Sequence, residues 1–187
     1  MSTPERVLVL GPPGGGKTTF ARALAVRTGL PLLDLDDHYW LPGWERRSAP
    51  EWLTRQRELA ARPRWIISGN YQPSLALRAA RAEAAVIVAP GPAAVLGRLF
   101  RRTLRRVLGD VDSLPPALRD APRWHSSRGL APLVRIALSY ERRLLPETRS
   151  LLDDHRVPHL VVGSVSEVDG VLGILAGRVG DSAGGHR

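Results

Sequence analysis

Apolar and polar positions follow one another along the chain in a pattern that predicts strands separated by helices. Short runs of β-branched and aliphatic residues are typical of strands buried inside a parallel sheet. We expect five strands, at residues 6–10 (RVLVL), 31–35 (PLLDL), 65–68 (WIIS), 85–89 (AVIVA) and, within 156–162, at HLVV. Strands that alternate with helical segments predict a three-layer α/β fold, in which helices cover both faces of a five-stranded parallel sheet.

Capping residues, prolines and glycines in the sequence indicate where the predicted helices begin and end. The first covers residues 17–28 and ends at a glycine and a proline, and the second covers about 49–61 and begins with proline and glutamate in its first turn. Another covers 130–145. Near the end of the chain, SVSE fits a capping box for a last helix over about 164–177. The stretch WLPGW at 40–44 is predicted to be a loop.

A glycine-rich segment joins the first strand to the first helix. Residues 11–18 (GPPGGGKT) match G-x-x-x-x-G-K-[ST] in the strand–loop–helix context that this motif requires. Successive backbone N–H groups in such a loop form an anion nest, and the first helical turn adds its unpaired amides. The segment predicts binding of ATP or another nucleoside triphosphate. The residues expected to contact it are Gly11, Pro12, Pro13, Gly14, Gly15, Gly16, Lys17, Thr18 and Thr19.

Lys17 is the only lysine of the chain, since every other basic residue among the 27 Lys and Arg is an arginine. A general preference for arginine does not explain the exception. An ammonium group is a compact charge on a thin stem, whereas a guanidinium is a wide planar fork. The sequence therefore predicts that Lys17 reaches around the loop to the β- and γ-phosphates, while the Thr18 hydroxyl binds Mg²⁺.

Three carboxylates follow the second predicted strand, at Asp34, Asp36 and Asp37. Ligands of open α/β sheets bind at the carboxyl ends of strands, so these acids are expected close to the loop. Asp36 is predicted to orient or deprotonate an acceptor hydroxyl, or to hold Mg²⁺ through water. The alternative for Asp34 and Asp37 is that they cap the next turn, which we favour for Asp37.

Aromatic residues surround these acids in the sequence. Tyr39, Trp40, Trp44 and Trp52 either stack on a planar substrate or form a small satellite core beneath a lid. The third strand is followed by Gly69, Asn70 and Tyr71. Glycine allows a close approach of the backbone, and the asparagine amide offers a donor and an acceptor. The predicted acceptor site comprises Asp34, Asp36, Tyr39, Trp40, Trp44, Gly69, Asn70 and Tyr71.

A basic helix is predicted from Pro92 onward. Five arginines fall within roughly 140° of one face, and four apolar residues lie on the opposite face. The arginines are Arg98, Arg101, Arg102, Arg105 and Arg106, and the apolar residues are Leu96, Phe100, Leu104 and Val107. Three interpretations of the arginine face remain open: it is exposed to solvent, it binds the phosphates during phosphoryl transfer, or it binds nucleic acid.

The segment after the basic helix is rich in Pro, Gly, Asp and Ser, which predicts an Arg-rich lid over about 107–130. The following helix carries Arg135, Arg142 and Arg143. We expect at least one arginine of the two helices to bind the phosphates.

Composition narrows the classes of protein. The net charge of +9 favours a polyanionic ligand, and the absence of cysteine excludes disulfides, thiolate metal sites and a cysteine nucleophile. The longest uncharged stretch, 84–97, is too short and too broken by proline for a membrane span. The N-terminus has no signal-peptide layout, so we expect a soluble, cytoplasmic protein. One domain is expected over 1–180, with a disordered tail at 181–187.

The motifs resemble those of the adenylate-kinase-like P-loop proteins often labelled "topology modulation protein". The resemblance extends over about residues 6–175 and depends on the phosphate loop and on Asp36, Trp40, Pro42, Gly43 and Trp44, then on Gly69, Asn70 and Tyr71. Arg98, Arg102 and Arg142 fall where arginines of the family lie. In two places the chain departs from the pattern: Ser68 replaces the acid before Gly-Asn-Tyr, and Ala89 replaces an acid at the end of the fourth strand. The first change removes a candidate magnesium ligand, which leaves Thr18, waters and Asp36.

The fold of this family resembles that of nucleotide and shikimate kinases, which implies transfer of a phosphoryl group to a small molecule. The expected enzyme uses ATP and Mg²⁺, and its expected catalytic residues are Lys17, Asp36, Arg98, Arg102 and Arg142. Its partner is a small hydroxyl or phosphate acceptor, and the chain is a monomer or a homodimer. Two alternatives remain open: a nucleic-acid-associated NTPase, and a nucleotide-responsive binding protein without transfer activity.

Overall fold

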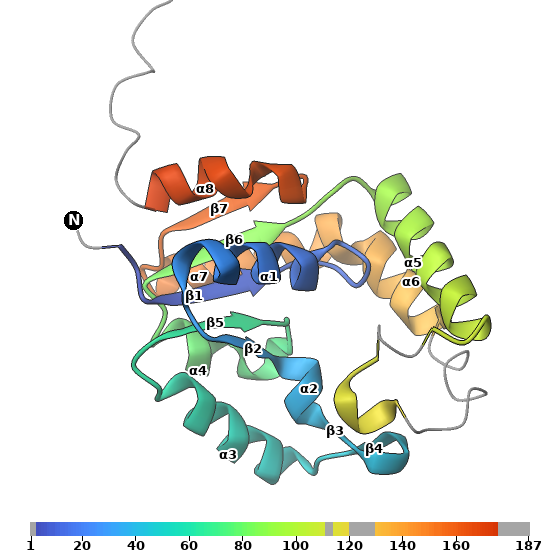
Figure 1. The fold of residues 1–187 in the computed structure, drawn as a ribbon. Helices are drawn as coiled ribbons and strands as arrows, with labels where there is room; N and C mark the ends of the chain where they lie inside the picture. Colours follow the sequence, from blue (N-terminus) through green and yellow to red (C-terminus); the bar gives the residue numbers. More distant parts are fainter. Residues whose placement is uncertain (1–2, 111–113, 120–129, 176–187) are drawn as a thin grey trace, which may run out of the picture.

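The computed structural model describes residues 3–110, 114–119 and 130–175. Its main sheet has five parallel strands in the order β2-β5-β1-β6-β7 (Figure 1). They are β1 (Arg6–Leu10), β2 (Leu32–Asp34), β5 (Trp65–Ser68), β6 (Ala84–Val88) and β7 (His159–Val162). The predicted parallel sheet is thereby confirmed. Because β1 lies in the middle, the loop that follows it emerges at the centre of the carboxyl edge of the sheet.

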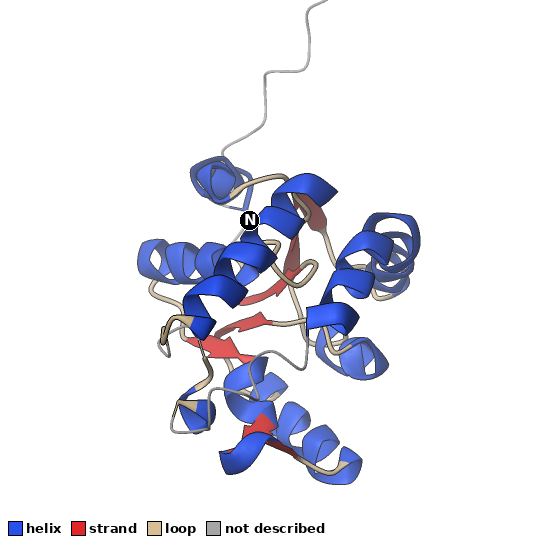
Figure 2. Ribbon diagram, turned by 90° about the vertical axis from the view of Figure 1, so that its right-hand side faces the viewer, coloured by secondary structure: helices blue, strands red, loops and turns tan. Residues whose placement is uncertain are grey.

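Helices cover both faces of the sheet (Figure 2). Successive side chains of a strand point to opposite faces, so Leu8 and Leu10 enter one core while Val7 and Val9 enter the other. The first core is closed by α3 (Ala49–Ala60), α4 (Leu75–Ala79) and α7 (Leu145–Asp154), and the second by α1 (Lys17–Thr28) and α8 (Val168–Leu175). This double burial explains why RVLVL has no polar position after its first residue.

A further pair of helices packs beside the phosphate loop. In α5 (Pro92–Val107), Val95 and Leu99 pack against Ala137 of α6 (Leu130–Ser139). The apolar face predicted for α5 is turned outward instead, since Phe100 is 68% exposed and Leu104 48% exposed. Of the basic side of α5, Arg98 and Arg102 face the body of the protein, whereas Arg101 and Arg105 are exposed.

Some elements differ from the prediction. The stretch WLPGW, predicted to be a loop, forms a short hairpin of β3 (Trp40–Leu41) and β4 (Glu45–Arg46) around the 3₁₀ turn η1 (Pro42–Trp44). Three short helical elements have no counterpart in the prediction: α2 (Leu35–Tyr39), the 3₁₀ turn η2 (Gln72–Ser74) and α4. The helix predicted over 130–145 continues beyond that range, through the π-helical turn η5 (Tyr140–Leu144) into α7.

The last helix begins as the 3₁₀ turn η6 (Val165–Glu167), at which the carboxylate of Glu167 accepts from the Ser164 backbone N–H at 2.9 Å. The helix α8 then runs to Leu175, and its predicted end near residue 177 lies outside the described residues.

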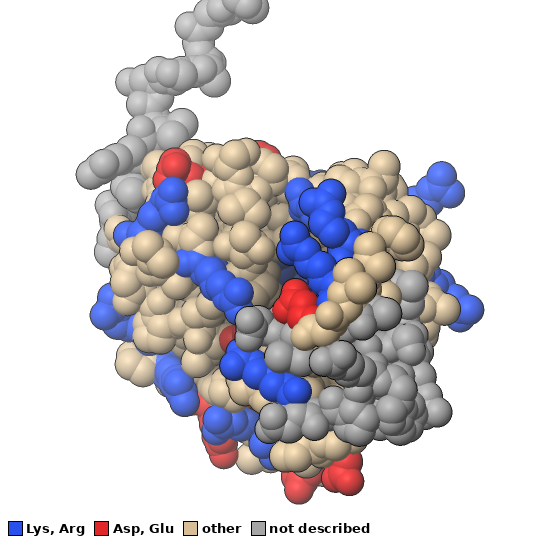
Figure 3. All heavy atoms as spheres, turned by 45° about the vertical axis from the view of Figure 1, so that its right-hand side comes forward, with Lys and Arg blue, Asp and Glu red and all other residues tan. Residues whose placement is uncertain are grey.

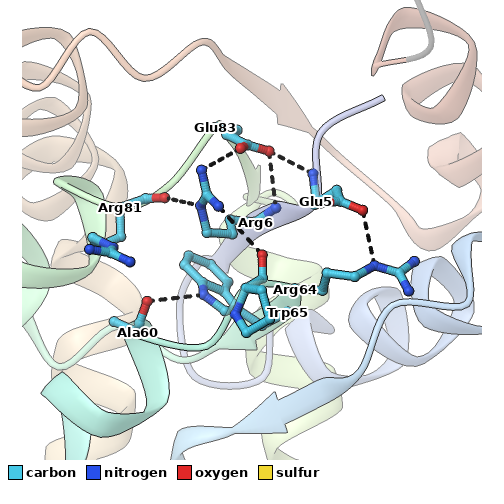
Figure 4. A network of polar contacts seen from close by, with 8 residues as sticks. Glu5, Arg6, Ala60, Arg64, Trp65, Arg81 and Glu83 are labelled. Carbon is cyan, nitrogen blue, oxygen red and sulfur yellow. Dashed lines mark hydrogen bonds and ion pairs between the residues drawn. The ribbon is translucent and has the colours of Figure 1, made fainter. Parts of the chain in front are cut away.

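Charged side chains join the strands at the edge of the sheet remote from the phosphate loop (Figure 4). The Arg6 guanidinium pairs with Glu83 and donates to the Arg81 carbonyl at 2.7 Å. Glu83 also accepts from the Glu5 backbone N–H at 2.6 Å. Because Arg6 begins β1 and Glu83 precedes β6, the contacts fix the register at the start of both strands.

Most of the predicted lid over 107–130 lies outside the described residues, as does the predicted tail at 181–187. The described part includes the 3₁₀ turn η3 (Pro116–Leu118), which packs on β3 and η1 with Leu118 buried. The assignment of residues 1–180 to one domain stays a prediction. Within the described ranges, no helix has the length and apolar character needed to cross a bilayer.

Candidate functional site

The loop between β1 and α1 has the backbone that its glycines allow. Gly11, Gly14 and Gly16 have φ values of 143°, 77° and 98°. A Cβ on Gly11 would lie 2.2 Å from the carbonyl oxygen of Val88, so only glycine fits there. No side chain caps α1 and no acid lies in its first turn, which is part of the described chain. Its first amides are therefore open to an anion.

Lys17 bends back over this loop. Its Nζ donates to the Pro12 carbonyl at 2.9 Å, and the same carbonyl accepts from the Gly15 backbone N–H at 3.0 Å. Burial lowers the pKa of Lys17 to about 8, although the carboxylates of Asp36 and Asp34 act in the opposite direction. The protein thus holds an incompletely compensated positive charge at the loop.

The acids at the end of β2 and in α2 lie beside the loop as predicted, but their contacts differ from the predicted ones. Thr18 Oγ1 donates to Asp34 Oδ2 at 3.0 Å. The other oxygen of Asp34 accepts from the Asp36 backbone N–H at 3.2 Å and so caps α2. The sequence predicts that Thr18 and Asp36 hold the metal and that Asp37 caps the following turn. In the structure, Asp34 is both the partner of Thr18 and the cap.

Asp36 is exposed at the mouth of the loop, where its Oδ1 accepts from the Tyr71 hydroxyl at 2.8 Å. Desolvation and then the charge of Asp36 raise the pKa of Asp34. Burial lowers the pKa of Arg102, and the charge of Asp36 opposes that shift. Each of these shifts includes a contribution from Asp36, so Asp36 is within electrostatic reach of Lys17, Asp34 and Arg102.

Two arginines of α5 face this group. Arg98 donates from its guanidinium to the Gly15 carbonyl at 2.8 Å, which fastens the helix to the loop. The Nε of Arg102 is buried and has no hydrogen-bond partner among the described residues. Figure 3 shows Lys and Arg side chains gathered around a hollow on this face of the molecule, with an acidic side chain among them.

Arg142, the third predicted clamp, is exposed in η5, and no hydrogen bond or ion pair among the described residues joins it to the loop. Arg101 and Arg105 are also exposed. The structure therefore brings Arg98 and Arg102 to the site and leaves the other described arginines of α5 in solvent.

The segment after β5 connects the two sides of the site. Asn70 Oδ1 accepts from the Gly11 backbone N–H at 3.0 Å, and Asn70 Nδ2 donates to the Gly11 carbonyl at 2.7 Å. Both polar ends of the side chain thus hold the start of the phosphate loop. Gly69 has φ 131° and lies so close to Leu35 that an added Cβ would approach its side chain to 3.0 Å. Tyr71 carries the hydroxyl that reaches Asp36.

The aromatic residues form a continuous cluster that reaches Asp36 through Tyr71. Tyr39 contacts Trp40, Trp52 and Tyr71 with ring centroids 4.9 to 5.2 Å apart, and Trp40 contacts Trp44 at 5.6 Å. Trp52 is buried, as the satellite-core interpretation predicts, whereas Trp40 and Trp44 are partly exposed. The Arg46 guanidinium lies 5.5 Å from the centre of the Trp40 ring.

Two features of the site were not anticipated from the sequence. Arg78 is completely buried and donates to the carbonyls of residues 69–71. The sequence signal that could have indicated this burial is the position of Arg78 three residues after Leu75, on the apolar side of α4. Ser68 is buried, its Oγ has no partner among described atoms, and it lies opposite Asp34 in the sheet register. The acid beside Thr18 thus comes from β2 instead of β5.

Comparison with known proteins supports the fold and the loop. Residues 7–50 match the family model of "ATPase family associated with various cellular activities (AAA)", which here spans β1, the loop, α1 and the acids. No curated protein sequence matches the chain.

Among solved structures, the shikimate kinase of Acinetobacter baumannii in complex with shikimate is 18% identical with a TM-score of 0.58, covering 92% of this chain and 93% of its own. The shikimate kinase of Bacteroides thetaiotaomicron is 15% identical with a TM-score of 0.55, covering 94% of this chain and 98% of its own. The chain therefore has the three-layer α/β fold of these shikimate kinases, with a five-stranded parallel sheet between helices.

Proposed function

We propose that this protein transfers the γ-phosphoryl group of ATP, or of another nucleoside triphosphate, to a small hydroxyl or phosphate acceptor. One observation carries the proposal. The exposed carboxylate of Asp36, held by the Tyr71 hydroxyl, lies within electrostatic reach of two half-buried cations, Lys17 and Arg102, at the mouth of the glycine loop. Phosphoryl transfer uses positively charged side chains that contact the phosphates, beside a carboxylate that faces the nucleophile.

The nucleotide side is formed by the loop and by α5. The amides at the start of α1 face the phosphates, and Lys17 needs only to leave the Pro12 carbonyl to reach them. Arg102 brings a guanidinium whose buried Nε lacks a partner among the described residues. We assign Arg102 to the transferring group and Arg98 to holding the loop, because the guanidinium of Arg98 already bonds Gly15.

The residues present suit a magnesium ion that is bound together with a nucleotide. Magnesium in phosphotransferases is usually held by one or two carboxylates and the substrate phosphates, with water completing the shell. Thr18 and Asp34 place a hydroxyl and a carboxylate 3.0 Å apart beside the loop. No group of three His, Cys, Asp or Glu able to hold a metal occurs in the described part of the chain, which fits such shared ligation. Magnesium, when bound, neutralises charge on the phosphate oxygens.

The acceptor side is formed by Asp36 and the aromatic cluster. Asp36 is exposed, and the Tyr71 hydroxyl donates to one of its oxygens. The other oxygen is left to accept a proton or a hydrogen bond from an acceptor hydroxyl. The partly exposed rings of Trp40 and Trp44 offer apolar surface nearby.

The finer assignments belong to the same proposal. The residues that resemble the topology modulation proteins, Asp36, Trp40 and Trp44 together with the Gly-Asn-Tyr segment, lie around this one site. We therefore propose membership of that group of P-loop proteins. Action in the cytoplasm and a monomeric or homodimeric state stay predictions from the sequence.

The test is an acceptor screen with matched variants. Nucleoside monophosphates, nucleosides, sugars and aminocyclitols are offered with ATP and Mg²⁺, and the release of diphosphate is measured. Lys17→Ala should abolish turnover. Asp36→Asn should lower the transfer rate at least 100-fold while sparing ATP affinity. Asp37→Asn removes the neighbouring acid of α2 and should change neither, so equal losses in the two Asp variants contradict the role of Asp36.

A nucleic-acid-associated NTPase is the second candidate, supported by the net charge of +9 and by the exposed Arg101 and Arg105. It requires binding to DNA or RNA that weakens steeply with salt. Absent or salt-independent binding near an ionic strength of about 0.1 M excludes it.

A further inference from the structure

Arg78 is a buried cation that the proposed chemistry does not use. It lies on α4 with no exposed surface, and no acidic side chain bonds it among the described residues. Burial lowers the pKa of Arg78, but a guanidinium remains protonated at neutral pH because its normal value is far above that range. A buried charge without a counter-charge destabilises a fold, so the contacts that hold Arg78 in place point to a functional reason for keeping it.

The contacts of Arg78 are three successive backbone carbonyls. Its guanidinium donates to Gly69 at 2.8 Å, to Asn70, and to Tyr71 at 3.3 Å. The three oxygens converge because the backbone coils tightly after β5, with φ values of 131° at Gly69 and 40° at Tyr71. The left-handed conformation of a tyrosine is unfavourable by itself. The planar fork of arginine matches three carbonyls that point to one place.

The coiled segment reaches both halves of the candidate site. On one side, the Asn70 amide holds the backbone of Gly11 through two hydrogen bonds. On the other side, the Tyr71 hydroxyl donates to Asp36. The segment of residues 69–71 therefore bridges the phosphate loop and the acceptor carboxylate, and Arg78 lies at its centre.

We propose that Arg78 is a positioning residue that fixes the 69–71 segment and thereby sets the phosphate loop and Asp36 in one geometry. The Asp36 half of this statement rests on the proposed function, and the phosphate-loop half rests on the contacts with Gly11. Ser74 supports the same segment, since its Oγ donates to the Tyr71 carbonyl at 3.0 Å and accepts from Nε2 of the buried Gln56 at 2.7 Å. Arg78 is distinguished by contacting all three carbonyls at once.

The test compares Arg78→Lys with Arg81→Lys. Lysine keeps the charge of residue 78 but offers a single ammonium in place of the fork. Arg81 lies three residues later with an exposed side chain, and only its backbone carbonyl contacts Arg6. We expect Arg78→Lys to weaken ATP affinity about tenfold and to lower transfer about 100-fold, since small displacements of reacting groups slow a reaction strongly. Arg81→Lys should alter neither quantity.

Double substitutions separate positioning from general loss of stability. If Arg78 acts on Asp36 through Tyr71, adding Tyr71→Phe to Arg78→Lys should cost no further transfer, whereas independent effects would multiply. Asn70→Ala combined with Arg78→Lys should likewise cost no further ATP affinity. Multiplicative losses in both pairs, or an unchanged ATP affinity in Arg78→Lys, overturn the proposal.

Hydrogen exchange of the unaltered protein tests the same anchor without any substitution. Three backbone N–H groups report on the segment: those of Gly69 and Ser74, which donate to the carbonyls of Val9 and Tyr71, and that of Gly11, which donates to Asn70 Oδ1. They should exchange as slowly as the amides of β1, because both are then released only by unfolding of the core. Exchange of this segment at the rate of an exposed loop overturns the proposal even if Arg78→Lys fails to fold. A protein that shows this slow exchange but transfers no phosphate to any acceptor contradicts the proposed function and leaves Arg78 as the anchor of the loop.

Discussion

Replacing Lys17 by methionine is expected to stabilise the ligand-free protein while abolishing nucleotide binding. Methionine has nearly the length of lysine but carries no charge. In the folded protein the ammonium of Lys17 is buried beside the phosphate loop, and the nearby Asp34 and Asp36 do not fully compensate for its lost hydration. The site therefore stores a charge that a triphosphate would neutralise, and without that ligand the charge weakens the fold.

The magnitude follows from the pKa of Lys17, which falls from 10.5 to about 8. A tenfold change in proton affinity corresponds to 1.36 kcal/mol, so the charged form is destabilised by about 3 kcal/mol at neutral pH. Methionine also gives up the hydrogen bond from Nζ to the Pro12 carbonyl, which contributes about 1 kcal/mol. We expect the free energy of unfolding to rise by about 2 kcal/mol in Lys17→Met at pH 7.

Urea denaturation of the two proteins at several pH values measures this effect. The pKa of Lys17 is lower in the folded than in the unfolded state, so the unfolded state binds more protons between about pH 8 and 10.5. The stability of the parent protein should therefore rise through that window relative to Lys17→Met, and the gap between them should close. Arg101→Met removes an exposed cation and should change stability by less than about 0.5 kcal/mol.

Two results would refute the reasoning. One is a Lys17→Met protein that is no more stable than its parent at pH 7, and the other is a gap that does not change with pH. Addition of ATP with Mg²⁺ should reverse the order, because a ligand at 100 times its Kd stabilises the parent by about 2.7 kcal/mol and leaves the methionine protein unaffected.

Three further substitutions address other parts of the site. Asp34→Asn should raise the Mg²⁺ concentration required for half-maximal ATP binding at least tenfold, measured by calorimetry over a Mg²⁺ series, and an unchanged requirement would remove Asp34 from the metal site. Arg102→Gln should lower transfer at least tenfold with a smaller effect on ATP affinity; equal effects on both would mean that it binds the ground state alone. Gly11→Ala should cost more than about 3 kcal/mol of stability because of the Val88 carbonyl, whereas Gly43→Ala, at φ 75° with open space around it, should cost about 1 kcal/mol; similar thermal shifts would contradict this contrast.

The sequence predicts the nucleotide half of the site well because that half is local. The strand RVLVL, the glycine loop and the helix that follows are contiguous, and their backbone conformations depend on residues within the motif. Burial on both faces also marks the strands, so their predicted limits agree with the structure to within about two residues.

The acceptor half depends on contacts between distant segments, which the residue pattern does not encode. Thr18 pairs with Asp34 instead of Asp36 because α2 begins one residue after Asp34 and turns Asp36 away from the threonine. The spacing predicts helix α5, but it does not show that Arg98 and Arg102 face the phosphate loop while Arg101 and Arg105 stay in solvent. In the sequence, Arg78 is one of many arginines. Its three contacts with backbone carbonyls are visible only in the structure.

The most direct measurement of the central claim follows the γ-phosphate itself. ATP labelled on its γ-phosphate is incubated with Mg²⁺, a pool of small metabolites and either the parent protein or Asp36→Asn, and the labelled products are separated. The proposed function requires label on a small organic acceptor with the parent protein and at least 100-fold less with Asp36→Asn. Label found solely in inorganic phosphate, at equal rates for both proteins, would contradict it.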